Sequence, residues 1–132
     1  MNQQLTPAST RFVFASDPLS IVRPEAHTCL IPSATNAKHD LLAFLATCLQ
    51  FPKYFGNNWD ALADCLGDLS WLQHKTVILI HPSVPVLDRK DLVTYLEVLS
   101  VAASQHAARG AHELIIVFPQ SKRDVILDIV GG

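Results

Sequence analysis

The sequence predicts an α/β domain in which a small three-stranded parallel sheet packs against helices. Short, continuous apolar runs alternate with longer segments of helical periodicity, and prolines or glycines separate the two. Strands that alternate with helices are joined by right-handed crossovers, which favours a parallel sheet. The chain has 132 residues, of which 49% are hydrophobic and 17% charged, so it can bury one core of its own.

Three apolar runs, at residues 28–31, 77–80 and 114–118, are the predicted strands. Each is followed at once, or after one histidine, by a proline, which cannot continue a central strand. The run at 77–80 is apolar at every position, as expected of a strand covered on both faces. We therefore expect this strand to lie at the centre of the sheet.

Apolar residues at helical spacing predict a helix after the first strand, a second over the segment that follows it, and a third before the last strand. Thr35 or Asn36 is the expected N-cap of the first helix, which must end before Pro52. The last helix is expected over residues 89–108, where Gly110 stops it.

The second helix has two opposite faces, one apolar and one acidic. At about 100° per residue, Asp60, Asp64 and Asp68 fall on one arc. The opposite arc holds Trp59, Leu62, Cys65, Leu66 and Leu69. Like charges four residues apart destabilise a helix by a few tenths of a kcal/mol. Such a stripe is usually just a solvated face, so further observations are needed to favour a function.

Small residues surround these carboxylates and favour a docking surface. Ala61, Ala63 and Gly67 would let a large partner approach the acidic stripe closely, and a glycine inside a helix costs about 1 kcal/mol relative to alanine. The partner should be basic. In the turn before the helix, Gly56 is expected to tolerate a positive φ, and Asn57 or Asn58 to serve as the N-cap.

Other chemistries find less support, and we expect neither an enzyme nor a cofactor. The six histidines are scattered and no metal-binding motif occurs, so no metal site is expected. Asp60 and Asp64 could act as an acid–base pair or hold Mg²⁺, but the sequence indicates no enclosing pocket. Cys65 and Trp59 lie on the apolar arc, where an inert thiol and a core indole are favoured over a nucleophile and a base-stacking platform.

Net charge, cysteine count and hydropathy indicate which partners and which cellular compartment to expect for the protein. A net charge of −2 does not favour binding to nucleic acid. Cys29, Cys48 and Cys65 are odd in number and lack C-x-x-C spacing, so we expect buried thiols in a reducing compartment rather than disulfides. The sequence contains no recognisable signal peptide or membrane span, which leads us to expect a cytoplasmic protein.

The run FPKYFGNNWDALADCL at residues 51–66 resembles the signature of the barstar family of bacterial ribonuclease inhibitors. That signature, P-x-Y-[YF]-G-x-N-x-D-A-L-x-D-C-L, builds the inhibitory loop and helix of the family. The order of elements is also similar to barstar over residues 27–119, which we expect to be the barstar-like domain. Residues 1–26 are then an N-terminal extension whose apolar patch at 12–14 adds an edge strand or packs on the domain. Residues 120–132 are a C-terminal extension of undetermined structure.

The resemblance implies a stoichiometric protein inhibitor, an immunity protein that plugs the basic active-site cleft of a ribonuclease or ribonuclease-like toxin. By this match Asp64 occupies the phosphate subsite, Asp60 pairs with neighbouring cations, Tyr54 packs near the catalytic histidine, and Asn58 caps the helix and lines the interface. The full expected partner-binding set is Tyr54, Gly56, Asn58, Asp60, Ala63, Asp64, Gly67, Asp68 and Gln105. The free protein is expected to be a monomer that binds neither nucleic acid nor membrane.

The sequence departs from the family pattern at four positions. Ala63 stands where barstar has a tryptophan, and a tryptophan appears instead at Trp59. Gln105 stands where barstar has an acid, while Asp68 adds a carboxylate elsewhere. Because specificity is a difference between affinities, these changes bear on which nuclease is recognised. An adaptor that binds some other basic protein without inhibiting an enzyme is therefore the alternative function.

Overall fold

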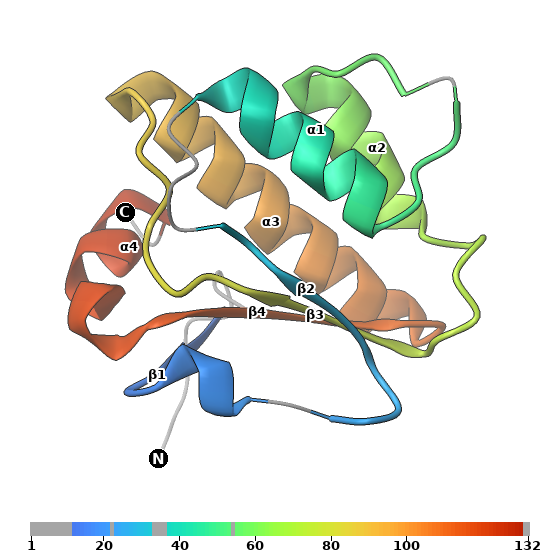
Figure 1. Ribbon diagram of the computed structural model, residues 1–132, viewed down its shortest axis with the longest axis horizontal. Coiled ribbons are helices and arrows are strands. Elements are labelled where there is room, and N and C mark those ends of the chain that lie inside the picture. The colour runs from blue at the N-terminus through green and yellow to red at the C-terminus, as the bar shows by residue number, and fades with distance from the viewer. Residues whose placement is uncertain (1–11, 22, 33–36, 54, 131–132) are drawn as a thin grey trace.

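The computed structural model describes residues 12–21, 23–32, 37–53 and 55–130, and the statements below refer to these. Four parallel strands form one sheet in the order β1-β4-β3-β2 (Figure 1). The elements are β1 (Phe12–Ala15), the 3-10 turn η2 (Pro18–Ser20), β2 (His27–Leu30), α1 (Lys38–Cys48), α2 (Trp59–Asp68), β3 (Thr76–Ile80), α3 (Arg89–Arg109), β4 (Glu113–Pro119), the 3-10 turn η3 (Gln120–Lys122) and α4 (Arg123–Val130).

The predicted mixed α/β class is confirmed, but the prediction of three strands is wrong. The apolar patch near the N-terminus forms a fourth strand, β1, which pairs with β4 in parallel so that Phe12 lies opposite Ile116. The Phe12 ring also packs on Phe118, with centroids 5.2 Å apart. An edge strand, one of the two expectations for this patch, is thus confirmed, but the local pattern could not identify its partner, which lies about a hundred residues further along the chain. β1 covers an edge of β4 that a three-stranded sheet would leave unpaired.

The sheet is covered on both faces, in keeping with period-2 alternation along its strands. α1, α2 and α3 lie together on one side (Figure 1), where Val77 and Leu79 join the main core. Ile78 and Ile80 point to the other side, where Ile21 of the segment after η2 packs against them. β3 therefore lies between two neighbours and is buried on both faces, which confirms its predicted central place.

The helices begin and end close to the predicted positions. α1 follows Ala37, which makes no side-chain cap, and the expected caps Thr35 and Asn36 lie outside the described residues. α3 begins where the Asp88 carboxylate accepts from the Asp91 amide, and it ends at Gly110, whose φ of 79° only glycine adopts freely. The C-terminal apolar segment is the helix α4. Among the described residues no helix is long and apolar enough to cross a membrane.

The cysteines correct a second expectation. Cys29 in β2 and Cys48, the last residue of α1, form a disulfide, so the prediction of three buried thiols is wrong for this pair. An odd number of cysteines leaves one unpaired but does not prevent the other two from bonding. Cys65 is the free thiol, and it is buried as predicted. Burial is the main cause that raises the pKa of Cys65, so this thiol is not an activated nucleophile.

A buried polar pair ties β3 to α3 and β4. The His81 imidazole, fully buried, donates from Nδ1 to the Val117 carbonyl at 3.0 Å and accepts at Nε2 from the Tyr95 hydroxyl at 2.7 Å. Its ring stacks on Phe118 with centroids 4.1 Å apart. Burial lowers the pKa of His81 to about 3, and it raises the pKa of Tyr95. Both ring nitrogens of the neutral His81 and the hydroxyl proton of Tyr95 are thus used in hydrogen bonds.

Candidate protein-binding site

The acidic and apolar faces predicted for α2 are present in the structure. Asp60, Asp64 and Asp68 are exposed, while Leu62 and Leu66 have no exposed surface. Trp59 packs against the core as predicted, but it is only half-buried. Its indole nitrogen donates to the Asp91 carboxylate of α3 at 3.0 Å, and its ring lies 5.8 Å from the Tyr95 ring. These contacts fix the start of α2 against α3.

The three carboxylates remain available to a cationic partner. Among the described residues, ion pairs join Arg23 to Glu113 and Arg123 to Asp124, and neither pair involves α2. Asp68 Oδ1 accepts from the Ser70 amide at 3.3 Å, which is a local bond within the turn after the helix. A basic surface that met this stripe would not first have to break an ion pair within the part of the chain described here.

The turn before α2 is held by Asn58, one of the two predicted caps. Its Oδ1 accepts from the Ala61 amide at 2.8 Å, and its Nδ2 donates to the Gly56 carbonyl at 3.3 Å. A Cβ on Gly56 would lie 3.1 Å from that Nδ2, so the absent side chain leaves room for the cap. The positive φ expected at Gly56 occurs instead at Asn57, at 58°, where asparagine tolerates it.

Aromatic rings support this turn from beneath. Phe51 packs on Phe55 with centroids 4.9 Å apart and meets the edge of Trp71 at 6.1 Å. The Trp71 indole donates to the Leu49 carbonyl at 2.9 Å, which fixes the chain just after α1. Tyr54, a predicted contact residue, lies outside the described residues. The described part of the turn is thus anchored on both sides of that position.

The last turn of α2 is held by two residues that the sequence did not single out. His106 Nε2 donates to the Leu66 carbonyl at 2.6 Å, and Arg109 donates to the Gly67 carbonyl. Burial is the main cause that lowers the pKa of His106, which favours the neutral ring. In sequence these are only basic residues at the end of α3, a common feature of helices, so no signal linked them to α2.

A groove between α2 and α3 gathers five of the nine predicted contact residues. Its volume is about 390 Å³, and it is lined by Ala63, Asp64, Gly67, Asp68, Val98, Val101, Ala102, Gln105 and Arg109. A Cβ on Gly67 would lie 2.7 Å from Gln105 Oε1, so the glycine allows this side chain to lie against the helix. Gly56, Asn58 and Asp60 do not line this groove but lie at or before the first turn of α2.

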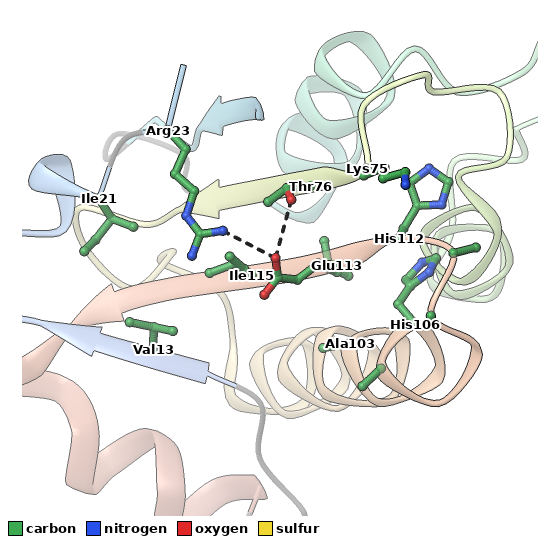
Figure 2. A pocket seen from close by; sticks show the side chains of 14 residues that line it. Val13, Ile21, Arg23, Lys75, Thr76, Ala103, His106, His112, Glu113 and Ile115 are labelled. Carbon is green, nitrogen blue, oxygen red and sulfur yellow. Dashed lines mark hydrogen bonds and ion pairs between the residues drawn. The ribbon is translucent and has the colours of Figure 1, made fainter. Parts of the chain in front are cut away.

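A larger cavity, of about 770 Å³, lies apart from the predicted residues and is lined from β1, β3, β4 and the end of α3. Figure 2 shows Arg23 and Glu113 facing each other on one side of it and His106 close to His112 on another. Because His106 also bonds to the Leu66 carbonyl, this cavity lies behind the last turn of α2. The candidate binding surface is therefore the exposed face of α2 with its groove, not this cavity.

Comparison with known families gives one match. The family model described as Barstar (barnase inhibitor) matches residues 28–119. No curated protein and no solved structure matches the chain. The matched region runs from β2 to β4 and contains all of α2 and the groove, whereas β1 and α4 lie outside it.

Proposed function

The chain belongs to the barstar family, and from this premise we propose that it is a stoichiometric protein inhibitor of a ribonuclease. The observation that carries the proposal is the face of α2, where the exposed carboxylates of Asp64 and Asp68 line a groove beside Ala63 and Gly67, and Asp60 is exposed one turn earlier on the same helix. The active-site cleft of a ribonuclease presents arginine and lysine side chains to the RNA backbone. An acidic helix of this shape is suited to enter such a cleft in place of RNA.

Asp64 is the centre of the proposed interface. It lies in the middle of α2 and lines the groove beside Ala63 and Gly67, so no long neighbouring side chain on its helix blocks a guanidinium group from reaching it. Carboxylates and guanidinium groups form charge-assisted and often bidentate hydrogen bonds. Asp60 and Asp68 extend the negative surface by one helical turn on either side. They steer a basic partner towards Asp64.

Gln105 and Arg109 favour an alternative partner. Both line the groove from α3, and neither carries the negative charge that the family pattern places at the position of Gln105. A groove with fewer carboxylates and one arginine suits a partner whose surface is less uniformly basic than a phosphate-binding cleft. The second candidate function is thus a barstar-like adaptor that binds a basic protein without inhibiting a nuclease.

The isolated protein is expected neither to cleave nor to bind RNA at physiological salt, because the α2 stripe repels phosphates. Fluorescence anisotropy with a labelled single-stranded RNA checks binding, and gel analysis of the same RNA checks cleavage. Robust binding of the RNA would contradict the proposal.

Inhibition is tested with the partner itself. The protein is used as bait in its native cell lysate and medium, and the recovered protein is assayed for RNA cleavage with increasing amounts of the bait. We expect cleavage to stop at one equivalent. A recovered basic protein that binds tightly but cleaves no RNA would support the adaptor instead.

Gly67→Ala is expected to weaken partner binding while leaving the fold intact. Alanine is favoured over glycine inside a helix by about 1 kcal/mol. The new Cβ would meet only the flexible end of Gln105, so the melting temperature should stay the same or rise. The displaced Gln105 would then occupy the groove. In a double-mutant cycle, Gln105→Ala should restore part of the lost affinity, whereas purely additive effects on the dissociation constant would contradict this account.

A further inference from the structure

One cluster of metal-ligating side chains lies away from the α2 surface, at the start of β2 and the end of α1. A ring nitrogen of His27 and the sulfurs of Cys29 and Cys48 all lie within 4.8 Å of one another. Cys29 has no exposed surface, and the other two residues are half-buried. These three residues bear no relation to the proposed inhibitory contacts.

The donor set matches the chemistry of zinc. Two thiolates and an imidazole are ligands that Zn²⁺ prefers, with Zn–S bonds of about 2.3 Å and Zn–N bonds of about 2.0 Å. A tetrahedral ion of that size holds its ligand atoms roughly 3 to 4 Å apart. The three ligand atoms lie within 4.8 Å of one another and the Cα atoms of the two cysteines are 6.1 Å apart, so the sulfurs stay within reach of a shared ion once they separate.

His27 makes a hydrogen bond of the kind that metal-binding histidines commonly make with their second ring nitrogen. Its Nε2 donates to the Cys48 carbonyl at 2.7 Å, which leaves Nδ1 with an unshared electron pair. A backbone carbonyl on the second nitrogen is the usual way in which a ligating ring is fixed. The ring centroid of His74, an exposed residue just before β3, lies 5.2 Å from that of His27. Its nitrogens are not among the ligand atoms that lie within 4.8 Å of one another, so the exposed ring would have to turn towards the site to supply a fourth ligand.

We propose that the reduced protein binds one zinc ion through Cys29, Cys48 and His27, with His74 as the fourth ligand. A dithiol supplies the two electrons and two protons that cleave the disulfide, and it becomes a disulfide itself. Zinc then binds and displaces one proton from each thiol. The disulfide and the zinc site use the same sulfurs, so the two states exclude each other.

Either state would fix the same point of the fold. Cys48 is the last residue of α1 and is followed by the segment that leads to the Asn58 cap of α2. The disulfide in the oxidised protein, or zinc in the reduced one, ties this point to β2. The sequence led us to expect no metal because its histidines are scattered and no metal-binding motif occurs, and Cys29 and Cys48 are 19 residues apart.

Cobalt(II) titration tests the proposal, because Co²⁺ in a tetrahedral thiolate site has visible absorption and sulfur-to-metal charge-transfer bands. The protein is reduced with a phosphine, which is then removed without oxygen, and Co²⁺ is added to the reduced and the oxidised forms. We expect one Co²⁺ per reduced chain, displaced by Zn²⁺, and no bands from the oxidised protein. Zn²⁺ should also raise the melting temperature of the reduced protein.

Single variants assign the ligands. Cys29→Ser and Cys48→Ser should each lose at least half of the charge-transfer intensity, whereas Cys65→Ser, the matched control, should keep it. His27→Ala should weaken zinc binding at least about tenfold, since losing even an outer-shell partner commonly has that effect. His74→Ala should weaken it less and alter the visible bands.

Three results would overturn the proposal: no cobalt bands from the reduced wild type, equal affinity of wild type and His27→Ala, or equal loss of the bands in Cys65→Ser and Cys29→Ser. Circular dichroism of each reduced sample separates a folded site from cysteines of an unfolded chain. If Zn²⁺ raises the melting temperature of the reduced Cys29→Ser/Cys48→Ser variant as much as that of wild type, the stabilisation has another source and the proposal is also wrong.

Discussion

Asp64→Ala is expected to weaken binding to the ribonuclease by about 2 to 5 kcal/mol, mainly through faster dissociation. The loss arises because the partner's arginine or lysine would stay in the interface without its carboxylate. That range describes truncation of buried charge pairs in general and rests in part on the barnase–barstar complex itself. Asp64 is exposed and lines the groove, so its removal takes nothing from the core.

Surface plasmon resonance checks the two rate constants of wild type and Asp64→Ala. Asp68→Ala is the matched control, because it removes the same charge one helical turn away, at the end of α2. Asp68→Ala should reduce the binding free energy by less than about 1 kcal/mol, as expected for a charge at the rim of the interface. For the wild type, the association rate should fall steeply with rising ionic strength, because exposed charges act only within about 10 Å at 0.1 M salt.

Both variants should keep their fold, and relief of repulsion between carboxylates four residues apart should if anything raise the melting temperature. If Asp64→Ala binds as tightly as wild type, or if it unfolds the domain, α2 is not the docking surface. The inhibitor proposal then loses its mechanism, although membership of the family is unaffected.

Local patterns were sufficient to predict most of the fold. β3 is apolar at every position because it is buried on both faces, and Gly110 ends α3 through its left-handed backbone. Pairings between distant segments could not be predicted in the same way. β1 pairs with β4 across a hundred residues, and the disulfide joins Cys29 to Cys48 although neither lies in a known motif. Nothing in the sequence near either residue specifies its distant partner.

The candidate surface was likewise predictable in its local features but not in its long-range contacts. Periodicity alone places Asp64 on the exposed face of α2, whereas residue type and position left Asn57 or Asn58 as its cap, and the structure selects Asn58. What holds that helix in place was not foreseen. His106 and Arg109 bond to carbonyls of the last turn of α2, about 40 residues earlier in the chain. Every residue has a backbone carbonyl, so a hydrogen bond to a carbonyl does not depend on the type of the accepting residue. Such contacts therefore leave no pattern in the sequence.

Acid is expected to destabilise the protein through His81. Its pKa is about 3 in the folded state because of burial, against 6.5 for an exposed imidazole. The unfolded chain therefore binds more protons, and stability rises with pH through this window. The contribution of His81 is fully present above pH 6.5 and is lost as the pH falls towards 3. At pH 4.5 the loss should reach roughly 2 to 3 kcal/mol.

The structural cause is the loss of an acceptor in a dry core. A proton on Nε2 removes the acceptor for the Tyr95 hydroxyl and places a cation against the Phe118 ring. Burial also lowers the pKa of His106, so this second imidazole acts in the same direction. Urea denaturation at several pH values between 7 and 4.5 measures how the free energy of unfolding depends on pH, with the effects of both histidines included.

The variant His81→Gln separates the contribution of His81 to this acid sensitivity from that of His106. The amide can donate to the Val117 carbonyl and accept from the Tyr95 hydroxyl, yet it does not titrate. The variant should be less stable than wild type at pH 7, because the ring contact with Phe118 is lost. The difference between the free energies of unfolding of wild type and His81→Gln should be smaller by about 2 to 3 kcal/mol at pH 4.5 than at pH 7. His39→Gln, at an exposed histidine, is the matched control for removing one imidazole. Parallel stability curves for wild type and His81→Gln would show that His81 does not carry the acid sensitivity.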